Sequence, residues 1–224
     1  MKTIIVSLIL LGFAGSALAV DRAELDNRIH KLTARFVALQ GKPDKGIPAE
    51  TLRQARGIVL MERTKAGFIF AYQGGNGVAL VKDPKSEQWS SAAFVNASEA
   101  SLGFQIGGQH SFVVILLMNS AGQDMLTQLN YKFGGEASGT AGKDSNGAEG
   151  VVSSIQAPVL VYSDRQGLFG GAAIKGDALS PDTDANVTYY DRAVTMQDIL
   201  VGNRVTPTDA ASELARQINE YSAK

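Results

Sequence analysis

Cysteine is absent from the 224-residue chain. Without it there are no disulfides to stabilise the fold, no thiolate ligands for zinc or iron–sulfur clusters, and no thiol nucleophile or redox switch. The fold must therefore be held together by core packing. A chain of this length is sufficient for one well-buried core.

Histidine is also scarce, with only two in the chain, His30 and His110. No G-x-S-x-G or H-E-x-x-H sequence occurs, so neither a nucleophile with its base nor a zinc triad can be assembled from motifs. A hydrolase that uses a pair of carboxylates stays open, because no two of the many acidic residues are singled out. No catalytic residue and no cofactor is predicted from these motifs.

Sites for nucleotides and metals have only incomplete signatures. The glycines at 103, 107 and 108 do not have the dinucleotide-binding spacing, and residues 139–145 lack the Ser or Thr that a phosphate-binding loop places on magnesium. Asp182, Asp184 and Asn186 match the first ligand positions of a calcium loop, but the required glycine and the final glutamate are missing. We therefore predict no metal site.

Long apolar runs are confined to the N-terminus. Residues 1–19 combine an early lysine, a short apolar stretch and an Ala-Leu-Ala ending, which is the pattern of a cleavable secretory signal peptide. Removal of 19 of the 224 residues leaves 205. We expect export to the periplasm, with secretion as the weaker alternative. The predicted organisation is a signal peptide (1–19), an amphipathic helix (20–46) and one domain with a C-terminal helix (47–224).

Charge is distributed unevenly along the chain. Residues 22–65 contain ten Lys and Arg against five Asp and Glu, a net charge of +5, whereas residues 66–224 have a net charge of −6 from ten basic and sixteen acidic residues. Such asymmetry is typical of a surface that meets an anionic partner. It is equally compatible with scattered, solvated charges.

Hydrophobic periodicity predicts helices at both ends and strands between them. Leu25, Ile29, Leu32, Phe36 and Leu39 form one stripe of a helix over 21–40, with basic residues on one flank. Shorter helices are expected at 47–57 and from a Thr206 cap to the C-terminus. After residue 57, short runs rich in Val, Ile and Phe predict an antiparallel meander, with a turn at 74–77 and a strand buried on both faces at 112–118.

Several spaced motifs in these strands resemble the SYLF domain family. The chain reads A-R-G-I, K-A-G-F, G-N-G-V, W-S-S-A, G-F-Q-I-G-G and V-I-L-L-M-N in the family's order, followed by Y-S-D-R-Q-G-L-F-G-G and N-V-T-Y-Y. The likeness covers roughly residues 50–205. Two departures are the absence of a proline and a basic residue in 139–147, and Asp191 where glycine is usual. We predict an α+β fold: a single, mainly antiparallel sheet, strongly curved or barrel-like, with flanking N- and C-terminal helices.

The resemblance implies a binding module and not an enzyme, because eukaryotic SYLF domains bind phosphoinositides and other anionic membranes and fungal members bind actin. For an exported protein the expected partners become anionic phospholipid, such as phosphatidylglycerol or cardiolipin, or lipopolysaccharide. The expected function is peripheral lipid binding in the cell envelope. The alternative is an envelope scaffold that binds a protein or peptidoglycan through a sheet edge. The candidate lipid-binding residues are Arg28, Lys31, Arg35, Arg53, Arg56, Arg63 and Lys65.

The first helix has two possible uses at this stage. Its apolar stripe could insert into a membrane, or it could pack on the sheet and leave only the basic flank to meet lipid.

Overall fold

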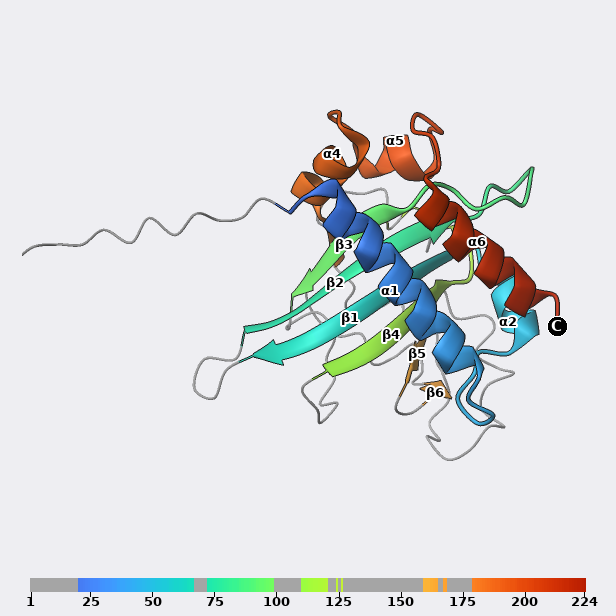
Figure 1. The fold of residues 1–224 in the computed structure, drawn as a ribbon. Helices are drawn as coiled ribbons and strands as arrows, with labels where there is room; N and C mark the ends of the chain where they lie inside the picture. The colour runs from blue at the N-terminus through green and yellow to red at the C-terminus, as the bar shows by residue number, and fades with distance from the viewer. Residues whose placement is uncertain are drawn as a thin grey trace, which may run out of the picture.

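A computed structural model describes residues 20–66, 72–98, 110–120, 124, 126, 159–164, 167–168 and 179–224 (Figure 1). The predicted signal peptide, the glycines at 103, 107 and 108 and the segment 139–147 lie outside these ranges. Within them no helix combines the length and the apolarity needed to cross a membrane.

The order of elements is helical at both ends and mostly strand between. The helices are α1 (Arg22–Gln40), α2 (Ala49–Gln54), α4 (Thr183–Tyr190), α5 (Met196–Leu200) and α6 (Asp209–Ser222). The strands are β1 (Gly57–Ala66), β2 (Tyr72–Val81), β3 (Ala93–Ser98), β4 (His110–Leu117), β5 (Val159–Ser163), β6 (Gly167–Leu168) and β7 (Leu179–Pro181). The predicted α+β character is confirmed.

The predicted strongly curved or barrel-like sheet is wrong. The strands form one open sheet in the order β6-β5-β4-β1-β2-β3-β7, and every neighbouring pair is antiparallel. Its two edge strands, β6 and β7, do not pair with each other. The physical reason is that helices cover the apolar side chains of the sheet, so the sheet does not have to close on itself to bury them.

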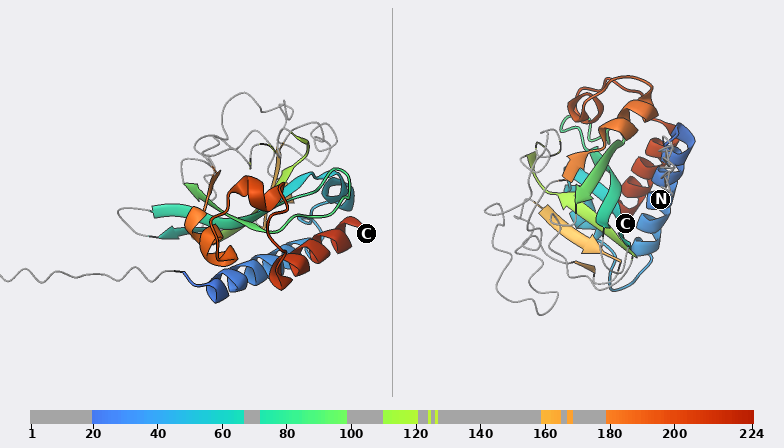
Figure 2. Two further views of the ribbon diagram at one scale, coloured as in Figure 1. Left: turned by 90° about the horizontal axis from the view of Figure 1, so that it is seen from above. Right: turned by 90° about the vertical axis from the view of Figure 1, so that its left-hand side faces the viewer.

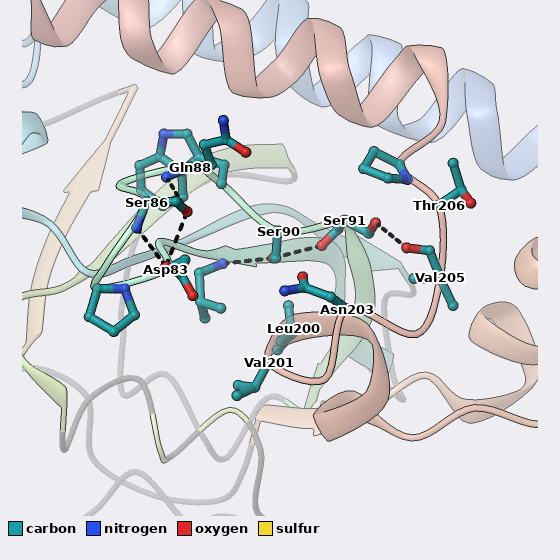
Figure 3. Close-up of a pocket in the computed structure, with 14 residues that line it drawn as sticks. Asp83, Ser86, Gln88, Ser90, Ser91, Leu200, Val201, Asn203, Val205 and Thr206 are labelled. Atoms are coloured by element: carbon teal, nitrogen blue, oxygen red, sulfur yellow. Dashed lines mark hydrogen bonds between the residues drawn. The ribbon is translucent and has the colours of Figure 1, made fainter.

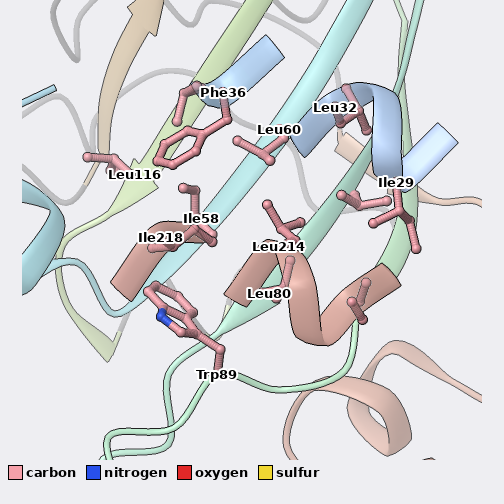
Figure 4. Close-up of a cluster of buried hydrophobic side chains, with 14 of the residues drawn as sticks. Ile29, Leu32, Phe36, Ile58, Leu60, Leu80, Trp89, Leu116, Leu214 and Ile218 are labelled. Carbon is pink, nitrogen blue, oxygen red and sulfur yellow. The ribbon is translucent and has the colours of Figure 1, made fainter. Parts of the chain in front are cut away.

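Helices α1 and α6 lie side by side across one face of the sheet (Figures 1 and 2). The five stripe residues of α1 are at most 1% exposed and join Leu214 and Ile218 of α6 in a cluster with Ile58 and Leu60 of β1 (Figure 4). The rings of Phe36 and Tyr221 meet edge to face at 5.8 Å between centroids. The apolar stripe of α1 is therefore part of the core.

The opposite face of the sheet has its own apolar cluster. Val59 and Met61 of β1 and Val113 and Ile115 of β4 lie there, packed with residues of α5. Because alternate residues of β4 enter the two clusters, this strand is buried on both faces. The prediction from its apolar run is confirmed.

Two local predictions need correction. Residues 74–77 are not a turn but part of β2, paired with β1 and β3. Gly77 is needed there because a Cβ at this position would lie 2.3 Å from the Leu60 carbonyl oxygen. The C-terminal helix is capped by Thr208 rather than Thr206, with the Thr208 side chain accepting a hydrogen bond from the Ala211 amide.

Candidate functional site

Three of the predicted lipid-binding residues, Arg28, Lys31 and Arg35, lie on α1, which crosses the sheet diagonally (Figure 1). We call these three residues the basic flank. Each of them lies near a carboxylate that a different part of the chain contributes. The positive charge seen in the sequence is therefore partly balanced within the fold.

Glu62 on β1 pairs with two residues of the basic flank. Lys31 Nζ lies 2.5 Å from Glu62 Oε2, and Arg35 Nε donates to Oε1 at 3.0 Å. Partial burial alone would raise the pKa of Glu62, but the hydrogen bonds and charges of Lys31 and Arg35 outweigh it and lower the pKa below its usual value. Two cations from adjacent turns of one helix thus hold a single anion.

Asp164, which follows β5, extends this arrangement toward the C-terminal end of α1. Its Oδ2 lies 3.9 Å from Arg35 Nη1, and its Oδ1 accepts a hydrogen bond from the Phe112 amide at 3.3 Å. Lys42, just beyond α1, donates to the Asp164 carbonyl oxygen at 2.9 Å. Lys42 is exposed and was not among the predicted site residues.

Arg28 occupies a more enclosed position than its neighbours. Its Nη1 lies 3.5 Å from Asp182 Oδ2, and its guanidinium lies 5.6 Å from the centroid of the Phe94 ring. Only 19% of the side chain is exposed, and Nη1 is buried without a hydrogen bond. Asp182 also caps α4 by accepting from the Ala185 amide at 3.2 Å. Arg28 therefore links α1 to α4 and β3.

Arg53 and Arg56 form a second basic group, at α2. Arg53 pairs with Glu50 and donates to the Ser222 carbonyl oxygen at 3.3 and 3.2 Å, which ties α2 to the end of α6. Arg56 Nη1 lies 3.0 Å from Glu87 Oε1. Figure 1 shows α2 beside the end of α6, away from the middle of α1, so the structure does not merge this group with the basic flank.

Arg63 and Lys65 lie on β1, one and three positions beyond Glu62, with their Cα atoms paired to Gly75 and Gln73 of β2. Their side chains lie outside the described part of the structure. In the described ranges no three His, Asp or Glu side chains come together in an arrangement that could hold a metal ion.

The N-V-T-Y-Y motif has a structural use in α4. The Asn186 side chain accepts from the Phe94 amide at 2.8 Å and donates to the Phe94 carbonyl oxygen at 3.0 Å, so it pairs with β3 as a neighbouring strand would. Tyr190 donates to the Ala92 carbonyl oxygen at 2.6 Å. The Tyr189 hydroxyl bonds to Asp26 of α1 at 2.5 Å. The motif fastens α4 to β3 and to α1.

Asp191, where the resemblance expects glycine, ends α4 in the left-handed region with φ of 50°. Glycine adopts this conformation without strain, whereas a residue with a Cβ does so at a cost. Aspartate in place of the usual glycine therefore affects the backbone conformation at the end of α4.

Sequence reasoning missed the carboxylates that pair with the basic flank, namely Glu62, Asp164 and Asp182. They lie on β1, after β5 and before α4, far from α1 along the chain. No spacing rule links them to the helix, because antiparallel pairing brings them there. The only available signal was that Glu62 is an acid inside a strand that is otherwise apolar from residue 57 to 61.

The chain was compared with known families and proteins. A family model described as "Ysc84: Las17-binding protein actin regulator" matches residues 98–221. The chain belongs to this family. The SYLF resemblance is thereby confirmed, and the family description is one of binding and regulation.

Similar proteins occur in animals and fungi. SH3 domain-containing YSC84-like protein 1 of Rattus norvegicus is 30% identical over 198 residues, covering 87% of this chain and 58% of the relative. LAS seventeen-binding protein 3 of Saccharomyces cerevisiae is 31% identical over 196 residues, covering 83% of this chain and 42% of the relative. The chain thus spans roughly two-fifths to three-fifths of these relatives' lengths. No solved structure matches the chain.

Proposed function

We propose that this Ysc84-family protein is a non-catalytic binding protein of the cell envelope that attaches peripherally to anionic lipid. In this proposal the signal peptide exports it to the periplasm, where phosphatidylglycerol, cardiolipin or lipopolysaccharide supplies the phosphate groups. Lys31 and Arg35 are the leading contacts, and the exposed Lys42 extends the same surface.

The observation that carries the proposal is the convergence of two cations on one anion. Lys31 and Arg35 are 64% and 40% exposed, yet both reach the Glu62 carboxylate. A lipid phosphate offers the same kind of acceptor, since Arg and Lys bind both carboxylates and phosphates through charge-assisted hydrogen bonds. Glu62 therefore occupies the position that a headgroup phosphate would take.

The free energies involved favour lipid contact through several charged residues at once. A Lys or Arg near an anionic surface contributes about 1 kcal/mol, whereas an exposed ion pair contributes about 0–1 kcal/mol to stability. Exchange of one internal carboxylate for one phosphate is thus close to neutral. Net affinity requires additional cations such as Lys42, and Arg53 and Arg56 where the membrane reaches α2.

Insertion of the α1 stripe is not part of the proposal. Each of its five buried apolar side chains contributes about 1.5–3 kcal/mol by leaving water. Lifting α1 away would also uncover the sheet residues beneath it, such as Ile58 and Leu60. Lipid contact through the basic flank leaves this core intact.

The test is co-sedimentation of the purified protein with vesicles of neutral phosphatidylcholine, with and without phosphatidylglycerol or cardiolipin. We expect binding only to the anionic vesicles and a decline in affinity with added salt. A Lys31→Glu, Arg35→Glu double variant should bind at least tenfold more weakly, as expected from about 1 kcal/mol per charge.

The matched control reverses two exposed charges, Arg216→Glu on α6 and Lys224→Glu just beyond it, and changes the net charge by the same amount. It should bind like the parent protein. Equal losses in both double variants would indicate a general charge effect, and absence of binding to any vesicle would reject the lipid proposal. The second outcome would favour the scaffold alternative, although the described sheet edges are short: β6 has two residues and β7 has three.

A further inference from the structure

A pocket of about 390 Å³ lies apart from the basic flank, between the loop that joins β2 to β3 and the segment that joins α5 to α6 (Figure 3). This volume is within the usual range of ligand sites. Gln88, Trp89 and Ser91 line it from the β2–β3 side, and Val201, Asn203 and Val205 line it from the other side. None of these residues belongs to the lipid site proposed above.

The pocket offers hydrogen-bonding groups that the fold leaves unused. The side chains of Gln88, Asn203 and Thr206 make no hydrogen bond within the described part of the chain. By contrast, Ser90 is already occupied: its hydroxyl donates to the Ser91 carbonyl oxygen at 2.8 Å and accepts from the Val81 amide at 3.1 Å. The free groups are thus mainly carboxamides, one on each side of the pocket.

The pocket has one charged group, a carboxylate that disfavours anionic ligands. Asp83 is the only charged residue among those that line it, and its Oδ1 accepts from the Lys85 amide at 2.9 Å and from the Ser86 amide at 2.7 Å. Apolar side chains also line the pocket, among them Val201, Val205 and Pro207. Such a lining suits an uncharged ligand that carries both amides and aliphatic groups.

Backbone conformation also marks this pocket. Among the described non-glycine residues only Glu87, Asp191 and Asn203 have positive φ. Glu87, at 57°, lies in the β2–β3 loop between two lining residues, and Asn203, at 48°, lines the opposite side. Strained backbone of this kind is concentrated at ligand sites. Two of the three such positions thus border one pocket.

Trp89 narrows the class of ligand. Its ring lies 5.0 Å from Lys82 Nζ, its Nε1 donates to Asn219 Oδ1 at 3.0 Å, and the residue is 8% exposed. The ring is therefore largely buried and bonded within the fold, with Lys82 over it, which disfavours stacking of a sugar on this ring. Trp89 still lines the pocket, so its signal reports on occupancy.

We propose that this pocket binds a short, neutral peptide segment of a partner. The Gln88 and Asn203 carboxamides pair with its backbone amides, and Val201, Val205 and Pro207 contact its aliphatic side chains. Asn186 provides a precedent for this chemistry in the same molecule, since its carboxamide pairs with both the amide and the carbonyl of Phe94. The proposed partner is distinct from anionic lipid and adds to the lipid function.

The experiment uses the full chain, labelled with ¹⁵N, and a set of N-acetylated, C-amidated tripeptides of alanine, valine, leucine and proline. Because the chain has one tryptophan, Trp89 gives a single indole N–H signal in the NMR spectrum. We expect at least one neutral tripeptide to shift this signal and the side-chain amide signals of Gln88 and Asn203 saturably, and the same peptide carrying an aspartate to bind more weakly.

Two variants locate the site. Gln88→Ala with Asn203→Gly removes both carboxamides while retaining a residue that adopts positive φ, and it should weaken peptide binding roughly tenfold or more. The control, Asn27→Ala, removes an exposed carboxamide on α1 and should change nothing. Lys31→Glu with Arg35→Glu should also leave peptide binding unchanged, which separates this proposal from the lipid proposal.

Three results would overturn the inference. The first is absence of a saturable shift with every neutral tripeptide at concentrations up to about 10 mM. The second is equal affinity in the Gln88→Ala, Asn203→Gly variant. The third is a saturable response of the same signals to a neutral disaccharide such as maltose but to none of the peptides, which would assign the pocket to carbohydrate.

Discussion

Helices α1 and α6 lie side by side on the same face of the sheet, but they use their charges differently. The basic flank of α1 reaches carboxylates on β1, after β5 and before α4. Arg216 of α6 pairs with Glu213 and Glu220 of its own helix, and Lys224 also pairs with Glu220. The charges of α1 therefore connect parts of the fold, whereas those of α6 are local and exposed. Only the charges of α1 are expected to affect both stability and binding.

The largest expected effect comes from removing the partner of Arg28. Asp182→Ala leaves a mostly buried guanidinium without its counter-ion and removes the cap of α4, so we expect a loss of about 2–3 kcal/mol in the free energy of unfolding. Urea denaturation measures it. Asp184→Ala, at an exposed position in the first turn of α4, is the control, and an equal loss there would show that Arg28 does not depend on Asp182.

A smaller effect is expected from Glu62 as the pH falls. The pKa of Glu62 is lower in the folded protein than in the unfolded chain, so its contribution is present above the unfolded pKa and disappears as the pH falls through the folded pKa. Because the pairs are partly exposed, we expect at most about 1 kcal/mol. Between about pH 6 and pH 3, the free energy of unfolding obtained from denaturation curves should decline less steeply for Glu62→Gln than for the parent protein. Parallel declines would contradict the pairing.

Asp191 contrasts with the charged residues of α1 and α6, because its effect on stability comes from backbone conformation and not from an ion pair. Asp191→Gly should stabilise the protein by about 0.5 kcal/mol, since glycine adopts positive φ without strain, although its greater freedom in the unfolded chain offsets part of the gain. The midpoint of thermal unfolding is the measurement. A lower midpoint would mean that the aspartate side chain compensates for the strain.

The smallest effect is expected on α6. Glu213→Gln removes one partly exposed partner of Arg216, which keeps Glu220 nearby. Exposed pairs within one helix contribute little, so the denaturation midpoint should match the parent protein within error. A clear loss of stability would remove the proposed difference between the two helices.

Much of the fold followed from local patterns in the sequence. The five apolar residues of α1 are spaced for one face, and all are buried. The run before Asn119 is long enough for a strand and alternates between two cores. The sheet's open form did not follow, because it depends on which helices cover which face. Gly77 was misjudged because close approach to a neighbouring strand and a tight turn call for the same residue.

The candidate site could be predicted from the sequence only in part. The periodicity of α1 placed Arg28, Lys31 and Arg35 together on one flank, as observed. Periodicity carries no information on what a flank meets across the fold, so Glu62 and Asp164 were not anticipated. Nor was the pocket, because Gln88 and Asn203 lie in connecting segments that meet only after the sheet has formed.

The central claim is that Glu62 holds the position of a lipid phosphate, and a gain of binding tests it most directly because damage to folding does not produce a gain. Binding of the parent protein, Glu62→Gln and Glu213→Gln to phosphatidylglycerol vesicles is measured at one low salt concentration. Glu62→Gln frees Lys31 and Arg35 and should bind roughly fivefold more tightly, whereas Glu213→Gln should match the parent protein. A folded Glu62→Gln variant that binds no more tightly than Glu213→Gln would contradict the claim.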